Sequence, residues 1–204
     1  MAELSVARSE LILGGQKSGK SRRAEDLARR WLWQDPSHRA VMVATAQPWD
    51  DEMRERIARH QQDRAERVPG MATVEEPLAL ASAIALHSHA NTLLVVDCLT
   101  LWLTNRLMPL EEASGELDTT NLKPNRLQAL VESNSIALLS GAIDNASGPI
   151  VLVSNEIGLG VIPMGREVRA FVDALGRLNQ SAAAVCQRVT LMAAGLPLFL
   201  KDSE

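Results

Sequence analysis

Aromatic residues are scarce in this chain: they make up 3% of its 204 residues, and tyrosine is absent. The core must therefore be built from aliphatic residues, and a hydrophobic content of 46% is enough for a sizeable one. Cysteine is also rare, and Cys98 and Cys186 form neither a CxxC pair nor a recognisable metal-binding pattern. We expect both to be buried free thiols of a protein in the reducing cytoplasm.

Long apolar runs and a strong charge of one sign are missing too. No uninterrupted apolar stretch approaches the roughly 20 residues of a membrane helix. The N-terminal segment MAELSVARSE lacks the basic and apolar regions of a signal peptide. The formal net charge of −4 argues against a broad cationic surface for nucleic acid or anionic lipid. We therefore expect one cytoplasmic domain spanning 1–204, with no membrane span and no nucleic-acid partner.

Short aliphatic runs alternate with longer helical patterns along the chain. Strands are expected at Leu11–Leu13, Ala40–Thr45, Leu93–Asp97, Ile150–Ser154, Arg188–Ala193 and Leu196–Lys201, the last two joined by a turn at Gly195-Leu196-Pro197. Helices are expected at Ser21–Trp33, Asp50–Arg67, Pro77–His89 and Arg166–Val185, and Glu111–Pro124 is interpreted as a surface loop. Apolar strands separated by helices predict an α/β, three-layer domain with a mostly parallel sheet and an antiparallel edge strand.

A glycine-rich segment follows the first expected strand. It fits G-x-x-x-x-G-K-[ST] at each fixed position and consists of Gly14, Gly15, Gln16, Lys17, Ser18, Gly19, Lys20 and Ser21. Glycines let backbone N–H groups approach phosphate oxygens, and the helix that follows adds its N-terminal N–H groups and dipole. Lys20 can reach the β- and γ-phosphates, and Ser21 can coordinate Mg²⁺. The segment predicts a P-loop NTPase-like domain that binds a nucleoside triphosphate, in which Lys17 contacts phosphate or is simply solvated.

The apolar strand Leu93–Asp97 ends on an acid. An acidic residue at this place is typical of the Walker B element, where it orients Mg²⁺ directly or through water. A strand-ending aspartate also often caps a helix. Both interpretations stay open, and the metal role is favoured.

The helix expected at Asp50–Arg67 has acids at its start and bases further along, an order that suits the helix dipole. At about 100° per residue, Met53, Ile57, His60 and Arg64 lie on one narrow stripe. The stripe begins apolar and ends with an imidazole and a guanidinium, and we expect it to face inward. A histidine in such a place is more often structural than catalytic, so its position alone leaves its role open.

Several motifs occur together and in order over about residues 11 to 201. They are GGQKSGKSRRAE at 14–25, VATAQPWDDEMRERIARHQQDR at 43–64, VEEPLAL at 74–80, VVDCLTLWLTN at 95–105, VSNEIGLGVIP at 153–163 and GRLNQ at 176–180. This set resembles the bifunctional adenosylcobinamide kinase / adenosylcobinamide-phosphate guanylyltransferase family of cobalamin synthesis. Many NTPases share the P-loop, whereas D-x-E-M-x-x-R-I-x-x-H-x-x-x-R and N-E-x-G-x-G-x-x-P are far more specific.

The resemblance implies a histidine that carries a covalent guanylyl group, and the matching residue is His60. It also implies guanine-nucleotide contacts at Thr45, Ala46 and Gln47, at Gln61, Gln62, Asp63 and Arg64, and at Glu75 and Asp97. Glu75 would accept hydrogen bonds from guanine or ribose, or else be an exposed acid before Pro77. Asn155 and Glu156 follow a strand at the carboxyl edge of the sheet, where they either contact a ligand or form a tight turn that caps the next helix.

The implied enzyme phosphorylates the aminopropanol hydroxyl of adenosylcobinamide with ATP or GTP. It then transfers GMP from GTP, through guanylyl-His60, to adenosylcobinamide phosphate, which gives adenosylcobinamide-GDP and pyrophosphate. Catalytic roles fall on His60 and Lys20, and Mg²⁺ binding falls on Ser21 and Asp97. The family forms homo-oligomers, so we expect one here. The alternatives are a single-activity P-loop kinase with a structural His60, and a nucleotide-dependent switch or assembly ATPase.

Overall fold

The computed structural model describes residues 4–48, 50–108 and 124–203 and has the predicted α/β architecture. Its seven-stranded sheet has the order β3-β2-β4-β5-β1-β6-β7. Neighbouring strands are parallel except β6 and β7, which are antiparallel, so the predicted antiparallel edge is confirmed. The strands are β1 (Ser9–Gly14), β2 (Arg39–Ala44), β3 (Ala72–Glu75), β4 (Thr92–Asp97), β5 (Ile150–Val153), β6 (Arg188–Ala193) and β7 (Leu196–Asp202).

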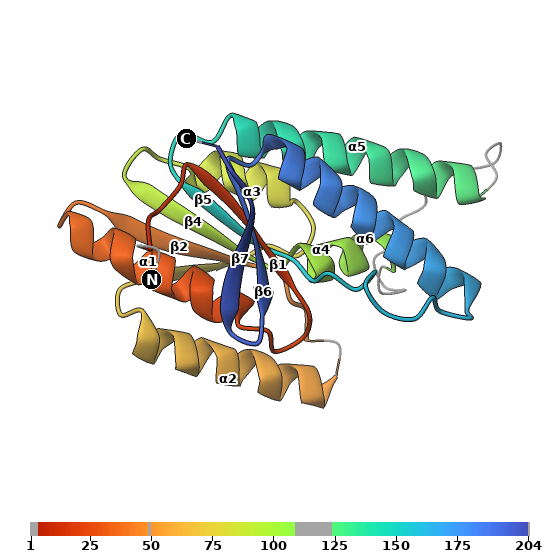
Figure 1. Ribbon diagram of the computed structural model, residues 1–204, viewed down its shortest axis with the longest axis horizontal. Coiled ribbons are helices and arrows are strands. Elements are labelled where there is room, and N and C mark those ends of the chain that lie inside the picture. The colour runs from red at the N-terminus through yellow and green to blue at the C-terminus, as the bar shows by residue number, and fades with distance from the viewer. Residues whose placement is uncertain (1–3, 49, 109–123, 204) are drawn as a thin grey trace.

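Helices cover both faces of this sheet, so that it forms the middle of three layers (Figure 1). They are α1 (Lys20–Gln34), α2 (Asp51–Arg67), α3 (Leu80–His87), α4 (Leu99–Leu107), α5 (Pro124–Asp144) and α6 (Arg166–Val185). Side chains alternate between the two faces along β1: Leu11 and Leu13 pack in the core under α3, α5 and α6, whereas Ile12 packs in the core under α1. The near-continuous apolar sequence of these strands follows from burial on both faces.

Apart from shifts of one or two residues at the ends of several elements, three features differ from the sequence prediction. The helix predicted at Pro77–His89 begins only at Leu80, because the Glu76 carboxylate accepts hydrogen bonds from the Leu78 and Ala79 N–H groups at 2.9 and 2.7 Å and turns the chain first. The short strand β3 was not predicted, since it is a mostly exposed edge strand with little hydrophobic signal. The final turn lies at Ala194–Gly195 and not at Gly195-Leu196-Pro197.

That turn has a physical cause in the backbone. Ala194 and Gly195 both have positive φ angles, 52° and 80°, as a two-residue hairpin turn between twisted strands requires. Leu196 and Pro197 therefore belong to β7, and proline is tolerated there because β7 is an edge strand.

The remaining expectations concern α4, α5 and the cysteines. The sequence analysis gave no bounds for these two helices, and the loop expected at Glu111–Pro124 lies outside the described residues except for Pro124, where α5 begins. Cys98 and Cys186 are buried free thiols, as predicted. In the described parts of the chain, no helix combines the length and apolar character needed to cross a membrane.

Candidate functional site

The glycine-rich loop between β1 and α1 is packed tightly against the β6–β7 hairpin. A Cβ atom added to Gly14, whose φ is +151°, would lie 2.5 Å from the Met192 carbonyl oxygen and 2.6 Å from Ser18 Oγ. At Gly19, which has φ +102°, an added Cβ would lie 3.2 Å from Gly195 Cα. The Gly195 N–H donates to the Ser18 carbonyl oxygen at 3.0 Å. The loop therefore needs glycine both for its backbone angles and for its close approach to the hairpin.

Lys20 and Ser21 begin α1 where the sequence motif requires them. The Lys20 side chain is buried, and its Nζ donates to the Gly15 carbonyl oxygen at 2.7 Å. Burial lowers the pKa of Lys20, while electrostatic interactions with Cys98 and Asp97 act in the opposite direction. Ser21 Oγ, in the first turn of α1, donates to Asp97 Oδ2 at the end of β4 at 3.2 Å.

Asp97 is the acid on which the charged groups of the site converge. Burial raises the pKa of Asp97, and it is opposed by the hydrogen bond from Ser21 and by the charges of His60, Arg64 and Lys20. The adjacent hydroxyl and carboxylate oxygens are the type of ligand that Mg²⁺ prefers. The described residues hold no cluster of three or more His, Cys, Asp or Glu side chains for a metal. The pair therefore fits an ion that keeps several waters and also binds phosphate oxygens.

A buried ion pair behind the loop anchors α1 to the sheet. Arg23 Nε lies 2.8 Å from Glu10 Oε1, and both side chains are almost fully buried. The same carboxylate oxygen accepts a hydrogen bond from Thr190 Oγ1 at 2.8 Å. The Arg23 guanidinium also lies over the ring of Phe199, 5.4 Å from its centroid. Sequence reasoning missed this pair, although an acid inside the apolar strand that precedes the motif was a signal for it.

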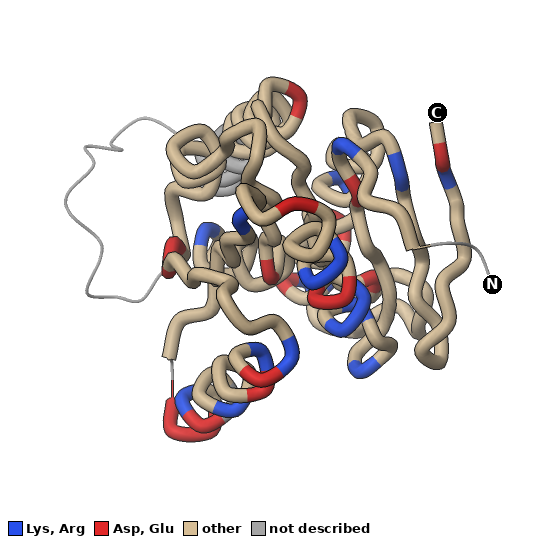
Figure 2. Tube along the Cα trace, turned by 90° about the vertical axis from the view of Figure 1, so that its left-hand side faces the viewer, with Lys and Arg blue, Asp and Glu red and all other residues tan. Residues whose placement is uncertain are grey.

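Helix α2 is held by longer and more exposed contacts. The side chain of Asp50 caps it by accepting from the Met53 N–H at 2.7 Å. Gln61 Nε2 donates to Glu75 Oε1 at 3.4 Å, and Arg67 forms an ion pair of 3.1 Å with Glu25 on α1. Arginine and acidic residues follow one another along α2 (Figure 2). The helix therefore rests against its neighbours mainly through polar contacts.

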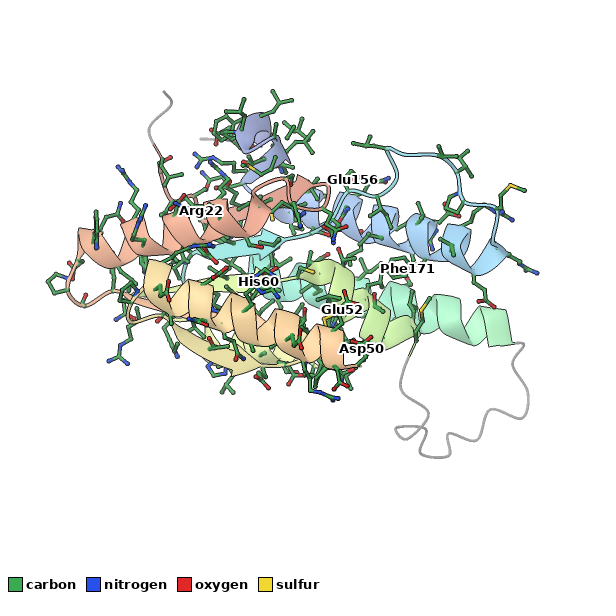
Figure 3. All side chains as sticks on the ribbon, turned by 90° about the horizontal axis from the view of Figure 1, so that it is seen from below. Arg22, Asp50, Glu52, His60, Glu156 and Phe171 are labelled. Carbon is green, nitrogen blue, oxygen red and sulfur yellow. The ribbon has the colours of Figure 1, made fainter. Side chains whose placement is uncertain are left out.

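The prediction that the stripe on α2 faces inward is only partly right. Arg64 is buried and donates to Thr73 Oγ1 at 3.4 Å, and Met53 and Ile57 are half-buried, but His60 is exposed. The apolar packing of this helix is concentrated near Val68, just past its end, so the preceding turns are less enclosed. His60, which is labelled on α2 in Figure 3, nevertheless shares the helix stripe of the half-buried Met53 and Ile57 and the buried Arg64.

The other predicted nucleotide contacts surround the same edge of the sheet at different depths. Thr45 is buried, and its Oγ1 is engaged with Cys98, donating to the carbonyl oxygen at 2.7 Å and accepting from the N–H at 2.9 Å. Half-buried residues are Gly19, Ser21, Ala46, Gln47, Asp63 and Asp97, and exposed residues are Gly15, Gln16, Lys17, Gln61, Gln62 and Glu75.

The segment after β5 borders the phosphate loop. The Glu156 N–H donates to the Gly14 carbonyl oxygen at 3.1 Å, and the Asn155 N–H donates to Thr100 Oγ1 at 2.9 Å. Asn179 on α6 donates from Nδ2 to the Asn155 carbonyl oxygen at 3.0 Å and to Glu156 Oε2 at 3.4 Å. These bonds bring Asn155 and Glu156 beside the loop, at the sheet edge where the sequence predicted a ligand contact.

Comparison with known proteins places this site in context. The cobinamide kinase / cobinamide phosphate guanyltransferase family matches residues 10–200. The chain is 45% identical over 193 residues to the bifunctional adenosylcobalamin biosynthesis protein CobP of Pseudomonas aeruginosa, covering 94% of this chain and 96% of that one. It is 32% identical over 191 residues to the bifunctional adenosylcobalamin biosynthesis protein CobU of Escherichia coli, covering 94% and 98%. A CobU protein of Salmonella typhimurium is 31% identical with the same coverage.

Proposed function

The chain belongs to the cobinamide kinase / cobinamide phosphate guanyltransferase family, and from its site we propose how one chain performs both reactions. The observation that carries the proposal is that the phosphate loop and α2 meet at the carboxyl ends of neighbouring strands. Ser21 of the loop donates to Asp97 at 3.2 Å, and the strand register sets Asp97 and Glu75 on either side of Ala44. Gln61, the neighbour of His60 on α2, donates to Glu75 at 3.4 Å. A triphosphate held by the loop would therefore lie between α1 and α2.

In the first reaction the chain positions a triphosphate and neutralises its charge. The N–H groups of the loop and of the first turn of α1 would bind the β- and γ-phosphates, with Lys20 as their counter-charge. Ser21 and Asp97 would hold Mg²⁺, which when bound supplies further charge neutralisation. The aminopropanol hydroxyl oxygen of adenosylcobinamide forms a bond to the γ-phosphorus of ATP or GTP, and the bond to the β–γ bridging oxygen breaks. ADP or GDP leaves with that electron pair, and the hydroxyl proton passes to solvent.

In the second reaction the neutral imidazole of His60 would be the nucleophile. Its nitrogen lone pair forms a bond to the α-phosphorus of GTP, and the bond to the bridging oxygen breaks, so that pyrophosphate leaves with that electron pair. An oxygen of adenosylcobinamide phosphate then attacks the same phosphorus, and the P–N bond breaks to regenerate the imidazole. The exposure of His60 leaves its ring accessible to both reactants.

We assign the guanine end of GTP to the surface shared by α2 and β3. Gln61 and Glu75 are hydrogen-bonded there at 3.4 Å, which sets an amide beside a carboxylate. A carboxylate can accept from the guanine N1–H and exocyclic amine or from ribose hydroxyls, and an amide can both donate and accept. The proposal also includes a cytoplasmic location, which the two free thiols favour, and a homo-oligomeric state, which the family resemblance implies.

Labelling with α-³²P-GTP tests the assignment of His60. We expect a label on the wild type that is labile in acid and stable in alkali, as a phosphoramidate is, and no label on His60→Ala. His89→Ala, which changes another exposed histidine, serves as the matched control and should label normally. An unlabelled wild type that still phosphorylates adenosylcobinamide would instead identify a single-activity kinase with a structural His60.

The switch or assembly ATPase makes a different prediction in a second assay. Incubation with adenosylcobinamide and GTP should yield adenosylcobinamide-GDP and pyrophosphate. Release of GDP and inorganic phosphate alone, with the corrinoid unchanged, would favour the switch.

A further inference from the structure

Helix α4 carries a buried amide that neither proposed reaction uses. The Asn105 side chain is 1% exposed. Its Nδ2 donates to the Thr45 carbonyl oxygen at 2.8 Å and to the Pro77 carbonyl oxygen at 3.2 Å. Both amide hydrogens are therefore used, each on a different segment of the chain.

The orientation of this amide follows from its two partners. Rotation by 180° would set Oδ1 against two carbonyl oxygens, so only the orientation with Nδ2 as donor is favourable. In that orientation Oδ1 is buried and has no hydrogen-bond partner among the described residues. An unpaired buried acceptor is unfavourable. The benefit of Asn105 must therefore come from its two donors.

The two carbonyl groups belong to segments that carry proposed nucleotide contacts. Thr45 follows β2 and precedes Ala46 and Gln47, and Pro77 lies two residues after Glu75. One turn earlier on α4, Trp102 Nε1 donates to the Leu78 carbonyl oxygen at 3.0 Å. Helix α4 thus holds the segments after β2 and β3 together through side-chain donors.

The position of β3 is in turn transmitted to α2. Gln61 on α2 contacts Glu75, and Arg64 contacts Thr73, so the helix that bears His60 rests on this strand. By contrast, the glycines and Lys20 of the phosphate loop contact the β6–β7 hairpin and the loop itself. A shift of the segments held by Asn105 would therefore move the base contacts and α2 and leave the phosphate contacts in place.

We propose that Asn105 is a positioning residue that selectively supports guanine recognition and guanylyl transfer to His60. The proposal rests on the function proposed above. It assigns to Asn105 no contact with substrate: the residue acts through the Thr45 and Pro77 segments.

Asn105→Asp tests this, because it keeps the size of the side chain and removes the NH₂ donor. With α-³²P-GTP, we expect the apparent KM for His60 labelling to rise by about tenfold or more, the scale of a lost hydrogen bond between buried groups. The KM for ATP in phosphorylation of adenosylcobinamide should change by less than about twofold, because the phosphate loop keeps its contacts. Below the pKa of the new carboxyl group, its O–H can donate one bond, so labelling should recover relative to wild type as pH falls.

Two further variants make the test independent of folding defects. Trp102→Phe keeps a ring but loses the donor to Leu78 and leaves a small cavity in the core, so it should lower stability while raising the GTP KM less than Asn105→Asp does. Asn91→Asp also loses an amide donor, to the Ser37 carbonyl oxygen at 2.9 Å, but at an exposed place on another segment, and should behave as wild type.

The outcomes separate the two proposals. An unlabelled wild type would overturn guanylyl transfer itself. If the wild type is labelled and both Asn105→Asp and Trp102→Phe have the same KM for GTP as the wild type, the positioning role alone is overturned. Equal losses of kinase and labelling activity in these variants would also overturn it, since they would indicate a general structural role.

Discussion

The phosphate loop and helix α2 approach Asp97 from two sides, yet they are fixed in different ways. The loop lies against backbone atoms of a hairpin, and its helix is anchored by the buried Glu10–Arg23 pair. Helix α2 is fixed by exposed or half-exposed polar contacts, and its histidine is open to solvent. We infer from this comparison that the two regions have different roles. The phosphate loop is a preorganised binding site, whereas the exposed surroundings of His60 leave room first for GTP and then for a bulky acceptor.

The largest expected effect is on the side of the phosphate loop. Lys20→Ala removes the cation nearest the β- and γ-phosphates and should slow phosphorylation of adenosylcobinamide by about a thousandfold, the loss typical of a preorganised charge contact. Transfer of ³²P from γ-labelled ATP measures it. A normal rate would show that the phosphates bind elsewhere.

Measuring His60 labelling in Lys20→Ala tests whether the phosphate loop also binds the GTP that labels His60. If one triphosphate site serves both reactions, Lys20→Ala lowers labelling as well. Unchanged labelling would instead assign GTP a second site beside α2.

The two ion pairs of α1 offer a matched comparison of stability. Arg23→Gln removes the shorter of the two arginine contacts of the buried Glu10 and leaves Arg188 at 3.7 Å, so it should lower the free energy of unfolding by about 3 kcal/mol, the low end for breaking a buried ion pair. Arg67→Gln removes the 3.1 Å pair with Glu25, but Arg67 is 40% exposed, so solvent screening limits its effect to less than about 1 kcal/mol. Urea unfolding of both variants gives the two values. Similar losses of unfolding free energy in the two variants would contradict the inference that Arg23 anchors α1 more strongly than Arg67 does.

Gly14 in the phosphate loop and Gly70 after α2 allow the backbone of the two regions to be compared in the same way. Gly14→Ala would force the Met192 backbone or the loop to move, because the added Cβ lies 2.5 Å from a carbonyl oxygen, and should cost about 2–3 kcal/mol together with nucleotide affinity. Gly70, after α2, has φ +89° but open space around it, so Gly70→Ala should cost only the backbone term of about 1 kcal/mol. Thermal unfolding and nucleotide titration distinguish them. Equal costs would mean that packing against Met192 is unimportant.

This contrast also explains what the sequence could predict. The phosphate loop, the parallel strands and the bounds of α6 followed from local signals: a fixed motif, continuous apolar runs and helical spacing. The Glu10–Arg23 pair and the Asn105–Thr45 hydrogen bond join residues 13 and 60 positions apart in the chain. An acid inside an apolar strand signals that it needs a partner, but no local pattern identifies the residue that supplies it. The exposure of His60 depends on how closely α2 packs against its neighbours, which helical periodicity does not determine. The short strand β3 lacked hydrophobic signal because it lies at the edge of the sheet.

The smallest expected effect compares the two faces of the sheet through their cysteines. Burial raises the pKa of Cys98 to about 11, with Asp97 adding to the rise, and it raises the pKa of Cys186 to about 12. Since both folded-state values exceed the unfolded value of 9.0, the unfolded chain loses these protons first, and their stabilising contribution is lost as pH rises through this range. Each thiol should then destabilise the fold by about 1.4 kcal/mol per pH unit above the unfolded pKa.

Substitution isolates this contribution from the other groups that titrate in alkali. Cys186→Ala creates a small cavity and should be less stable than wild type at pH 8, but it cannot ionise. Its deficit should therefore shrink as pH rises above about 9, the unfolded value of the Cys186 pKa. Chemical unfolding of both proteins from pH 8 to pH 11 measures the deficit. A constant difference would show that Cys186 ionises equally easily in the folded and unfolded chain, and hence that its face of the sheet is less enclosed than its burial indicates.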